Sequence, residues 1–229
     1  MIGRRQWLAA ASAALFGGHE IARGAATLTV YTFGDSVLDC GHYNAHGVHP
    51  GGLLVRNDDR LFPEFKARDL QTRRPAVLEH RARDGATISG LPLQSRALTI
   101  HGDSIALVTI GGNDLIAGLA GDKGAGLKSF EAALDGWLRG LPIRPVLLGT
   151  VYDPTFGDDT HNFLQYDARI ARANHRRMNE IIGSLAARHG KLADIHAHFL
   201  RGDPSWYVHT IEPSLKGASE VRRVFLNAL

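Results

Sequence analysis

The chain has 229 residues, which is enough for one α/β domain with a sizeable core and short for two. Hydrophobic residues make up 44% of it and charged residues 21%, an ordinary composition for a globular protein, and no internal repeat or low-complexity linker divides the sequence. The formal net charge is only +3 and the basic residues are scattered along the chain, which argues against nucleic-acid binding.

Residues 1–26 have the pattern of a secretory signal peptide. Arg4 and Arg5 precede a short apolar run, and small residues around Ala22 to Ala26 follow it. The paired arginines are typical of twin-arginine export. We therefore expect an exported protein, periplasmic or secreted, with its domain at residues 27–229. The apolar run is too short to span a bilayer of about 30 Å, so we expect no stable membrane insertion. An uncleaved anchor and a misassigned start codon are the alternatives.

The rest of the chain alternates between predicted strands and predicted helices. Apolar runs that end at turn residues predict strands, and apolar residues at helical spacing predict helices. Strands that alternate with helices indicate an α/β fold, in which a parallel sheet is covered on both faces. The predicted strands are residues 27–33, 75–81, 105–110, 144–151 and 192–196, and the predicted helices are residues 126–141 and 166–189.

Reactive side chains directly follow two of these strands. Gly34-Asp35-Ser36 follows the first strand, and Gly111-Gly112-Asn113-Asp114 follows the third. Ligands of open parallel sheets bind outside the carboxyl ends of the strands, so Ser36 and Asn113 are expected to converge on one crevice as nucleophile and oxyanion donor. Ser36 is also expected to begin a helix, whose N-terminal amides favour developing negative charge. The alternative is that Ser36 is only a helix cap and Asn113 only a turn residue.

These motifs resemble those of the SGNH (GDSL) hydrolase family, which comprises esterases, lipases and deacetylases. Gly34-Asp35-Ser36 matches the serine block of the family, residues 85–87 look like its glycine block, and residues 111–114 match its asparagine block. The resemblance covers residues 27–226 and implies a flavodoxin-like three-layer sandwich with a central parallel sheet. It also implies that the backbone amides of Ser36 and Gly85 and the side-chain amide of Asn113 bind the oxyanion, without a cofactor or a metal ion. An ordinary turn glycine is the alternative for Gly85.

The fourth block departs from the family pattern. The family usually reads Asp-x-x-His-Pro, whereas this chain has His209 in place of the acid and Glu212 in place of the histidine, followed by Pro213. His209 is the leading candidate for the base, with Glu212 holding its imidazole in the correct tautomer. Glu212 acting directly on Ser36, a base supplied by His196 or His198, and a loss of hydrolysis are the alternatives. The other histidines also remain open as bases, among them His42, His46 and His49 after the serine block.

Two other features carry weaker predictions. The only cysteine, Cys40, cannot form an intramolecular disulfide and is interpreted as a packed thiol. Three carboxylates lie in the loop after the fourth strand, but their spacing fits no calcium-binding loop, so no metal site is predicted. These carboxylates are Asp153, Asp158 and Asp159.

The sequence therefore predicts a serine hydrolase that cleaves carboxylic esters, as an esterase or a carbohydrate O-deacetylase, through an acyl-enzyme on Ser36. The expected substrate is a small-molecule or glycan ester, and the oligomeric state is left open. The competing hypothesis is a catalytically silent binding protein on the same scaffold, for example one that binds acylated glycans.

Overall fold

The computed structural model describes residues 26–100 and 102–229. The predicted signal peptide, residues 1–26, lies outside the described residues except for Ala26. Within the described part of the chain, no helix is both long and apolar enough to cross a membrane.

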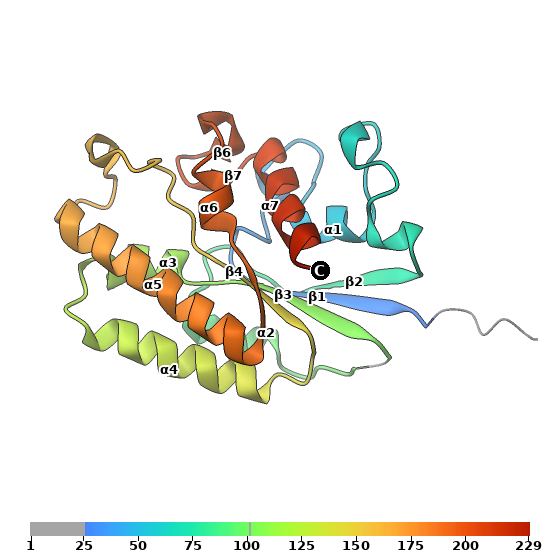
Figure 1. The fold of residues 1–229 in the computed structure, drawn as a ribbon, viewed down its shortest axis with the longest axis horizontal. Coiled ribbons are helices and arrows are strands. Elements are labelled where there is room, and N and C mark those ends of the chain that lie inside the picture. Colours follow the sequence, from blue (N-terminus) through green and yellow to red (C-terminus); the bar gives the residue numbers. More distant parts are fainter. Residues whose placement is uncertain (1–25, 101) are drawn as a thin grey trace, which may run out of the picture.

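A parallel sheet of five strands forms the centre of the domain (Figure 1). This sheet has the strand order 2-1-3-4-5, which is that of flavodoxin-like folds. The structure confirms the α/β class, the flavodoxin-like arrangement and the predicted strands. From one edge to the other, the strands are β2 (Ala76–His80), β1 (Leu28–Gly34), β3 (Ser104–Thr109), β4 (Val146–Gly149) and β5 (Gly190–Ala193). The fifth strand lies earlier than predicted, because the chain enters a helix at Ile195.

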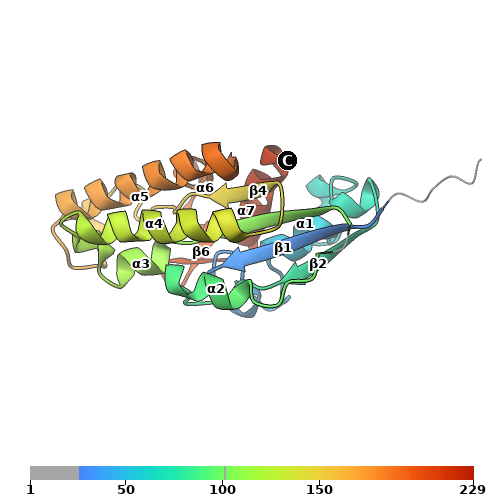
Figure 2. The same ribbon diagram turned by 90° about the horizontal axis from the view of Figure 1, so that it is seen from below.

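Helices cover both faces of the sheet and make it the middle of three layers (Figures 1 and 2). One face carries α2 (Leu91–Gln94), α3 (Gly112–Ile116), α4 (Ala125–Gly140) and α5 (Ala168–His189). The other face carries α1 (Pro50–Val55), α6 (Ile195–Phe199) and α7 (Leu215–Ala228). Short 3₁₀ segments connect these elements at Gly41–Tyr43, Pro63–Phe65, Leu70–Thr72, Ile88–Gly90, Leu119–Gly121, Asp159–His161 and Pro204–Trp206.

The three central strands, β1, β3 and β4, are buried along almost their whole length because each face packs into its own core. Successive side chains of a strand point to opposite faces. In β1, Phe33 packs against α4 and α5, while Val30 packs against α1 and α7. In β3, Val108 packs into the same core as Phe33, and Leu107 packs into the same core as Val30. Burial on both faces explains why these runs lack the apolar–polar alternation of a half-exposed strand.

The two long helices occupy almost the predicted ranges. The buried side chains of α4 recur every three or four residues, which is the spacing of one helix face: Leu127, Phe130, Leu134 and Leu138. Helix α5 begins two residues later than predicted because Asp167 caps it. The Asp167 carboxylate accepts hydrogen bonds from the backbone amides of Arg169 and Ile170 at 3.0 and 3.2 Å.

A buried arginine joins α7 to the loop that follows α1. The Arg222 side chain is fully buried, and its guanidinium lies 3.4 Å from the centre of the Phe65 ring. It donates hydrogen bonds to Asn57 Oδ1 at 2.8 Å and to Ser219 Oγ at 2.5 Å. Burial lowers the pKa of Arg222 to about 10. A cation held by neutral acceptors alone depends strongly on each of them.

We therefore predict that Asn57→Ala destabilises the fold by about 2–3 kcal/mol, because a buried charge loses an acceptor. The measurement is the free energy of unfolding from chemical denaturation. Arg60→Ala is the control, because the Arg60 side chain is 91% exposed and its pairing with Asp58 is a surface ion pair. Such a pair contributes at most about 1 kcal/mol. Equal losses in the two variants would contradict the prediction.

Candidate active site

Ser36 lies on a tight turn at the carboxyl end of β1. Gly34 has φ +117°, and a Cβ there would lie 1.6 Å from the carbonyl oxygen of Thr109 in β3, so only glycine fits. After it, the backbone amides of Leu38 and Asp39 both donate to the Asp35 carbonyl, at 3.2 and 3.1 Å. The chain makes this single turn and does not continue into a helix. The prediction that Ser36 begins a helix is therefore wrong.

The carboxyl group of Asp35 fastens this turn to the sheet. Its Oδ1 accepts hydrogen bonds from the Thr109 hydroxyl at 2.8 Å and from the backbone amide of Val37 at 3.2 Å. The Asp35 side chain is buried, and burial raises its pKa to about 7. The group beside the candidate nucleophile is therefore partly protonated near neutral pH.

Asp39, at the end of this turn, links it to two neighbouring segments. Its carboxylate pairs with His80 Nε2 at 3.0 Å and accepts a hydrogen bond from the backbone amide of Asp84 at 3.0 Å. The second bond holds the loop that contains Gly85 against the serine turn. Gly85 has φ +72°, and a Cβ at this position would meet nothing within 4 Å. The backbone conformation, and not a lack of space, is what favours glycine here.

Asn113 lies on the other side of the same loop. The turn at Gly111 starts helix α3, and Asn113 Nδ2 donates to the Ala86 carbonyl at 3.0 Å. The neighbouring Asp114 carboxylate accepts from the backbone amide of Ile88 at 3.1 Å. The first three motifs, separated in sequence, thus meet at the carboxyl edge of the sheet.

This edge offers several N–H groups at one place. Among the residues that the structure describes, neither the Ser36 amide nor the Gly85 amide donates a hydrogen bond. The Asn113 side-chain amide has two hydrogens, and its bond to Ala86 uses one of them. Such an arrangement has the donors that an oxyanion needs.

The fourth block forms a hairpin that turns a carboxyl group, and not an imidazole, toward Ser36. Its strands are β6 (Tyr207–Val208) and β7 (Glu212–Pro213), with Val208 paired to Glu212. Glu212 is buried beside Ser36. His209 lies on the exposed turn between the strands, at φ +48°, with its ring 5.6 Å from that of Tyr43.

The surroundings of Glu212 set its charge. Burial raises its pKa, while the Ser36 hydroxyl and the imidazoles of His42 and His209 lower it. Its Oε2 atom is buried and has no hydrogen-bond partner among the described residues. This oxygen therefore has an unused capacity to accept a hydrogen bond.

Sequence reasoning missed a polar cluster close to Glu212. His42 Nε2 lies 3.1 Å from Asp84 Oδ2, and the Tyr43 hydroxyl donates to the same oxygen at 2.7 Å. The charges of His42 and Asp84 act on the Glu212 carboxyl in opposite directions. His42 is one of the histidines that follow the serine block, but no spacing in the sequence indicates a contact between His42 and Asp84.

The structure does not bring the alternative histidines into the cavity beside Ser36. His198 Nε2 is paired with Glu220 of α7 at 2.8 Å, and His196 packs edge-on against the ring of His175. Burial, together with His175, lowers the pKa of His196. Neither His196 nor His198 lines that cavity, which measures about 140 Å³, and Gly85, His209 and Glu212 do not line it either.

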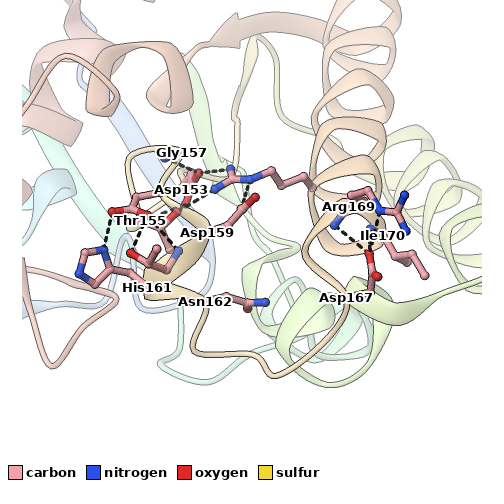
Figure 3. Close-up of polar contacts among 12 residues, drawn as sticks. Asp153, Thr155, Gly157, Asp159, His161, Asn162, Asp167, Arg169 and Ile170 are labelled. Atoms are coloured by element: carbon pink, nitrogen blue, oxygen red, sulfur yellow. Dashed lines mark hydrogen bonds and ion pairs between the residues drawn. The ribbon is translucent and has the colours of Figure 1, made fainter.

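The remaining polar residues of interest have structural partners. Asp153 and Asp159 both pair with Arg172 of α5. Figure 3 labels the two aspartates of these ion pairs. Asp158 caps the 3₁₀ turn that follows it. No group of three or more His, Cys, Asp or Glu side chains in the described ranges could hold a metal ion. Cys40 is fully buried, and burial raises the pKa of its thiol to about 12, as expected of a packed thiol.

Comparisons with known proteins agree with this architecture. The pattern of the GDSL-like Lipase/Acylhydrolase family matches residues 32–218. No curated protein matches the chain. Among solved structures, an α/β hydrolase from the metagenome of Lake Arreo, Spain, is 23% identical with a TM-score of 0.59, and the match covers 89% of this chain and 94% of that one.

Two further solved structures resemble the chain over a similar length. The acetylxylan esterase Axe2 from Geobacillus stearothermophilus is 19% identical with a TM-score of 0.59, and 89% and 94% of the two chains are covered. A member of the lipolytic G-D-S-L family from Veillonella parvula is 15% identical with a TM-score of 0.59, and 87% and 97% are covered. At these identities the likeness establishes the fold.

The raised pKa of Asp35 predicts a pH-dependent contribution to stability. The folded state binds the Asp35 proton more tightly than the unfolded chain, so this stabilisation is complete below about pH 4 and is lost as the pH rises through about 7. Asp35→Asn keeps an acceptor for Thr109 and cannot ionise. The free energy of unfolding of Asp35→Asn relative to the unsubstituted protein should therefore increase between pH 4 and pH 8.

Denaturation curves at several pH values measure this difference. Asp122→Asn is the control of opposite sign, because backbone hydrogen bonds led by that from Leu127 lower the pKa of Asp122. A difference for Asp35→Asn that does not change with pH would contradict the prediction.

Proposed function

Because this chain belongs to the GDSL-like lipase/acylhydrolase family, we propose that it is a serine esterase that cleaves carboxylic esters through an acyl-enzyme on Ser36. The observation that carries the proposal is the position of the buried Glu212 carboxyl beside the Ser36 hydroxyl, at the edge where Gly85 and Asn113 meet. The resemblance to an acetylxylan esterase supports an ester of a small molecule or a glycan as the substrate.

In the first half of the reaction, the Ser36 oxygen attacks the carbonyl carbon of the ester. Glu212 accepts the serine proton as the new C–O bond forms. The amides of Ser36 and Gly85 and the free Asn113 N–H bind the oxyanion of the tetrahedral intermediate. The bond to the alcohol then breaks, and the leaving alkoxide takes the proton from Glu212. An ester of Ser36 remains.

In the second half, water attacks this ester and gives its proton to Glu212. The tetrahedral intermediate collapses, the carboxylic acid leaves, and the proton returns to the Ser36 oxygen. Glu212 is a better base when its pKa lies closer to the working pH, so burial that raises this pKa favours the reaction. In this proposal His209 and His42 act on Glu212 through their charge and do not take the serine proton.

The function is tested by labelling with a fluorophosphonate probe and by hydrolysis of p-nitrophenyl acetate and butyrate. We expect labelling and turnover in the unsubstituted protein and neither in Ser36→Ala. Folded protein without labelling or turnover would favour the silent binding protein on the same scaffold. Labelling that persists in Ser36→Ala would place the nucleophile elsewhere.

The base is tested by comparing Glu212→Gln with His209→Ala. Loss of a general base lowers turnover by about 10²–10⁴, and we expect a loss of this size in Glu212→Gln. His209→Ala should have a smaller effect, because the imidazole lies on an exposed turn. In the unsubstituted protein, kcat/KM should rise with pH as Glu212 ionises. A full loss in His209→Ala with near-normal turnover in Glu212→Gln would make His209 the base.

A further inference from the structure

A partly open, mainly apolar cavity of about 140 Å³ lies beside Ser36. Its lining includes Ser36 and Asn113, residues of the segment 151–164, which is called the roof below, and residues of helix α5. The mechanism proposed above uses only the part of the cavity at Ser36 and Asn113. The apolar lining includes Ile110, Leu115, Ile116, Leu164, Ala168 and Ala171.

The charged residues of the roof are neutralised by one another and by α5. Asp153 pairs with Arg172 at 2.9 Å and accepts hydrogen bonds from the amide and hydroxyl of Thr155 at 2.9 and 2.6 Å. Asp159, which is labelled in Figure 3, pairs with the same arginine. These carboxylates are therefore engaged within the roof, and the cavity offers a ligand mainly hydrocarbon surface.

The same contacts hold the roof in place before a ligand arrives. Arg172 ties two points of the loop to α5, and Asn162 closes the loop further on by donating to the Tyr166 carbonyl at 2.8 Å. At the rim, the side chains of Ile116 and Phe163 are 41% and 39% exposed. An apolar entrance of this kind favours an apolar ligand.

We propose that this cavity binds the acyl chain of the substrate, and that the substrate is an ester of a carboxylic acid with about four to six carbons. This inference depends on the proposed function for the identity of the reacting group. Its size follows from the volume, because an apolar protein cavity of about 150 Å³ holds a molecule of benzene, which has six carbons. An acetyl group would leave most of the space empty.

The position of the carbonyl carbon decides which part of the ester enters. That carbon must lie against the Ser36 oxygen while its oxygen faces the amides of Gly85 and Asn113. Because Ser36 and Asn113 both line the cavity, the chain attached to the carbonyl carbon begins beside its apolar lining.

The first experiment measures kcat/KM for p-nitrophenyl acetate, butyrate, hexanoate and decanoate. Each buried methylene should raise kcat/KM by about fourfold until the cavity is full, so hexanoate should exceed acetate by at least about tenfold, and decanoate should fall below hexanoate. A preference for acetate, or equal values for all four esters, would overturn the inference and leave the proposed function standing.

Filling the cavity provides the second test. Ala171→Phe places a ring in the cavity from α5 and should lower the ratio of hexanoate to acetate kcat/KM by about tenfold. Ala173→Phe is the matched control, because Ala173 is exposed on the same helix and does not line the cavity. If Ala171→Phe does not fold, Ala168→Leu fills the cavity from the first residue of α5. An unchanged ratio in a folded filling variant would overturn the inference.

A binding measurement separates this inference from the proposed function. Ser36→Ala protein is titrated with hexanamide and with acetamide, neutral probes that need no hydrolysis. We expect hexanamide to bind at least about tenfold more tightly, and Ala171→Phe in the same background to abolish the difference. Hexanamide binding without any ester hydrolysis would support the cavity assignment and contradict the proposed function. Equal binding of the two amides would overturn the assignment.

Discussion

The candidate site depends on the close approach of two backbones where β1 and β3 end. Gly34 passes so near the carbonyl of Thr109 that no other residue fits there. The same contact lets the Asp35 amide donate to that carbonyl at 3.1 Å and lets the Thr109 hydroxyl reach the Asp35 carboxyl. Because β1 and β3 are neighbours, the turns that follow them emerge side by side. The serine and asparagine motifs meet for this reason.

This arrangement gathers carboxyl groups in a region of low polarity. Burial is the main reason why the pKa of Asp35 is high, and the charges of Glu212 and Asp114 raise it further. Burial is also the first cause of the raised pKa values of Glu212 and Asp114. A carboxylate is a poor base at its ordinary pKa, so the desolvation that costs stability is also what makes Glu212 a better proton acceptor. Carboxyl groups that ionise close together also repel any further negative charge in the same space.

The sheet and the long helices could be predicted because local signals and tertiary packing agree. The strands around Val30 and Val108 are apolar on both faces, and α4 repeats its apolar residues at helical spacing. The expected helix at Ser36 is not formed; the chain makes one turn, and Asp39 at its end pairs with His80 and accepts a hydrogen bond from the Asp84 amide. These partners are distant from Asp39 in sequence, and no local sequence pattern predicts the contacts.

The orientation of the fourth block shows what sequence spacing alone leaves undecided. His209 and Glu212 are three residues apart, and either could face Ser36 from a loop of unknown shape. The hairpin decides between them: Val208 pairs with Glu212, and the turn between them has φ values of +48° at His209 and +73° at Thr210. Neither residue is a glycine or an asparagine, so the sequence does not signal these conformations. Contacts from outside, such as the Tyr152 hydroxyl donating to the Ile211 carbonyl at 2.6 Å, fix the turn. The group that faces the serine is thus selected by tertiary contacts, which the spacing of an acid and a histidine within one motif does not determine.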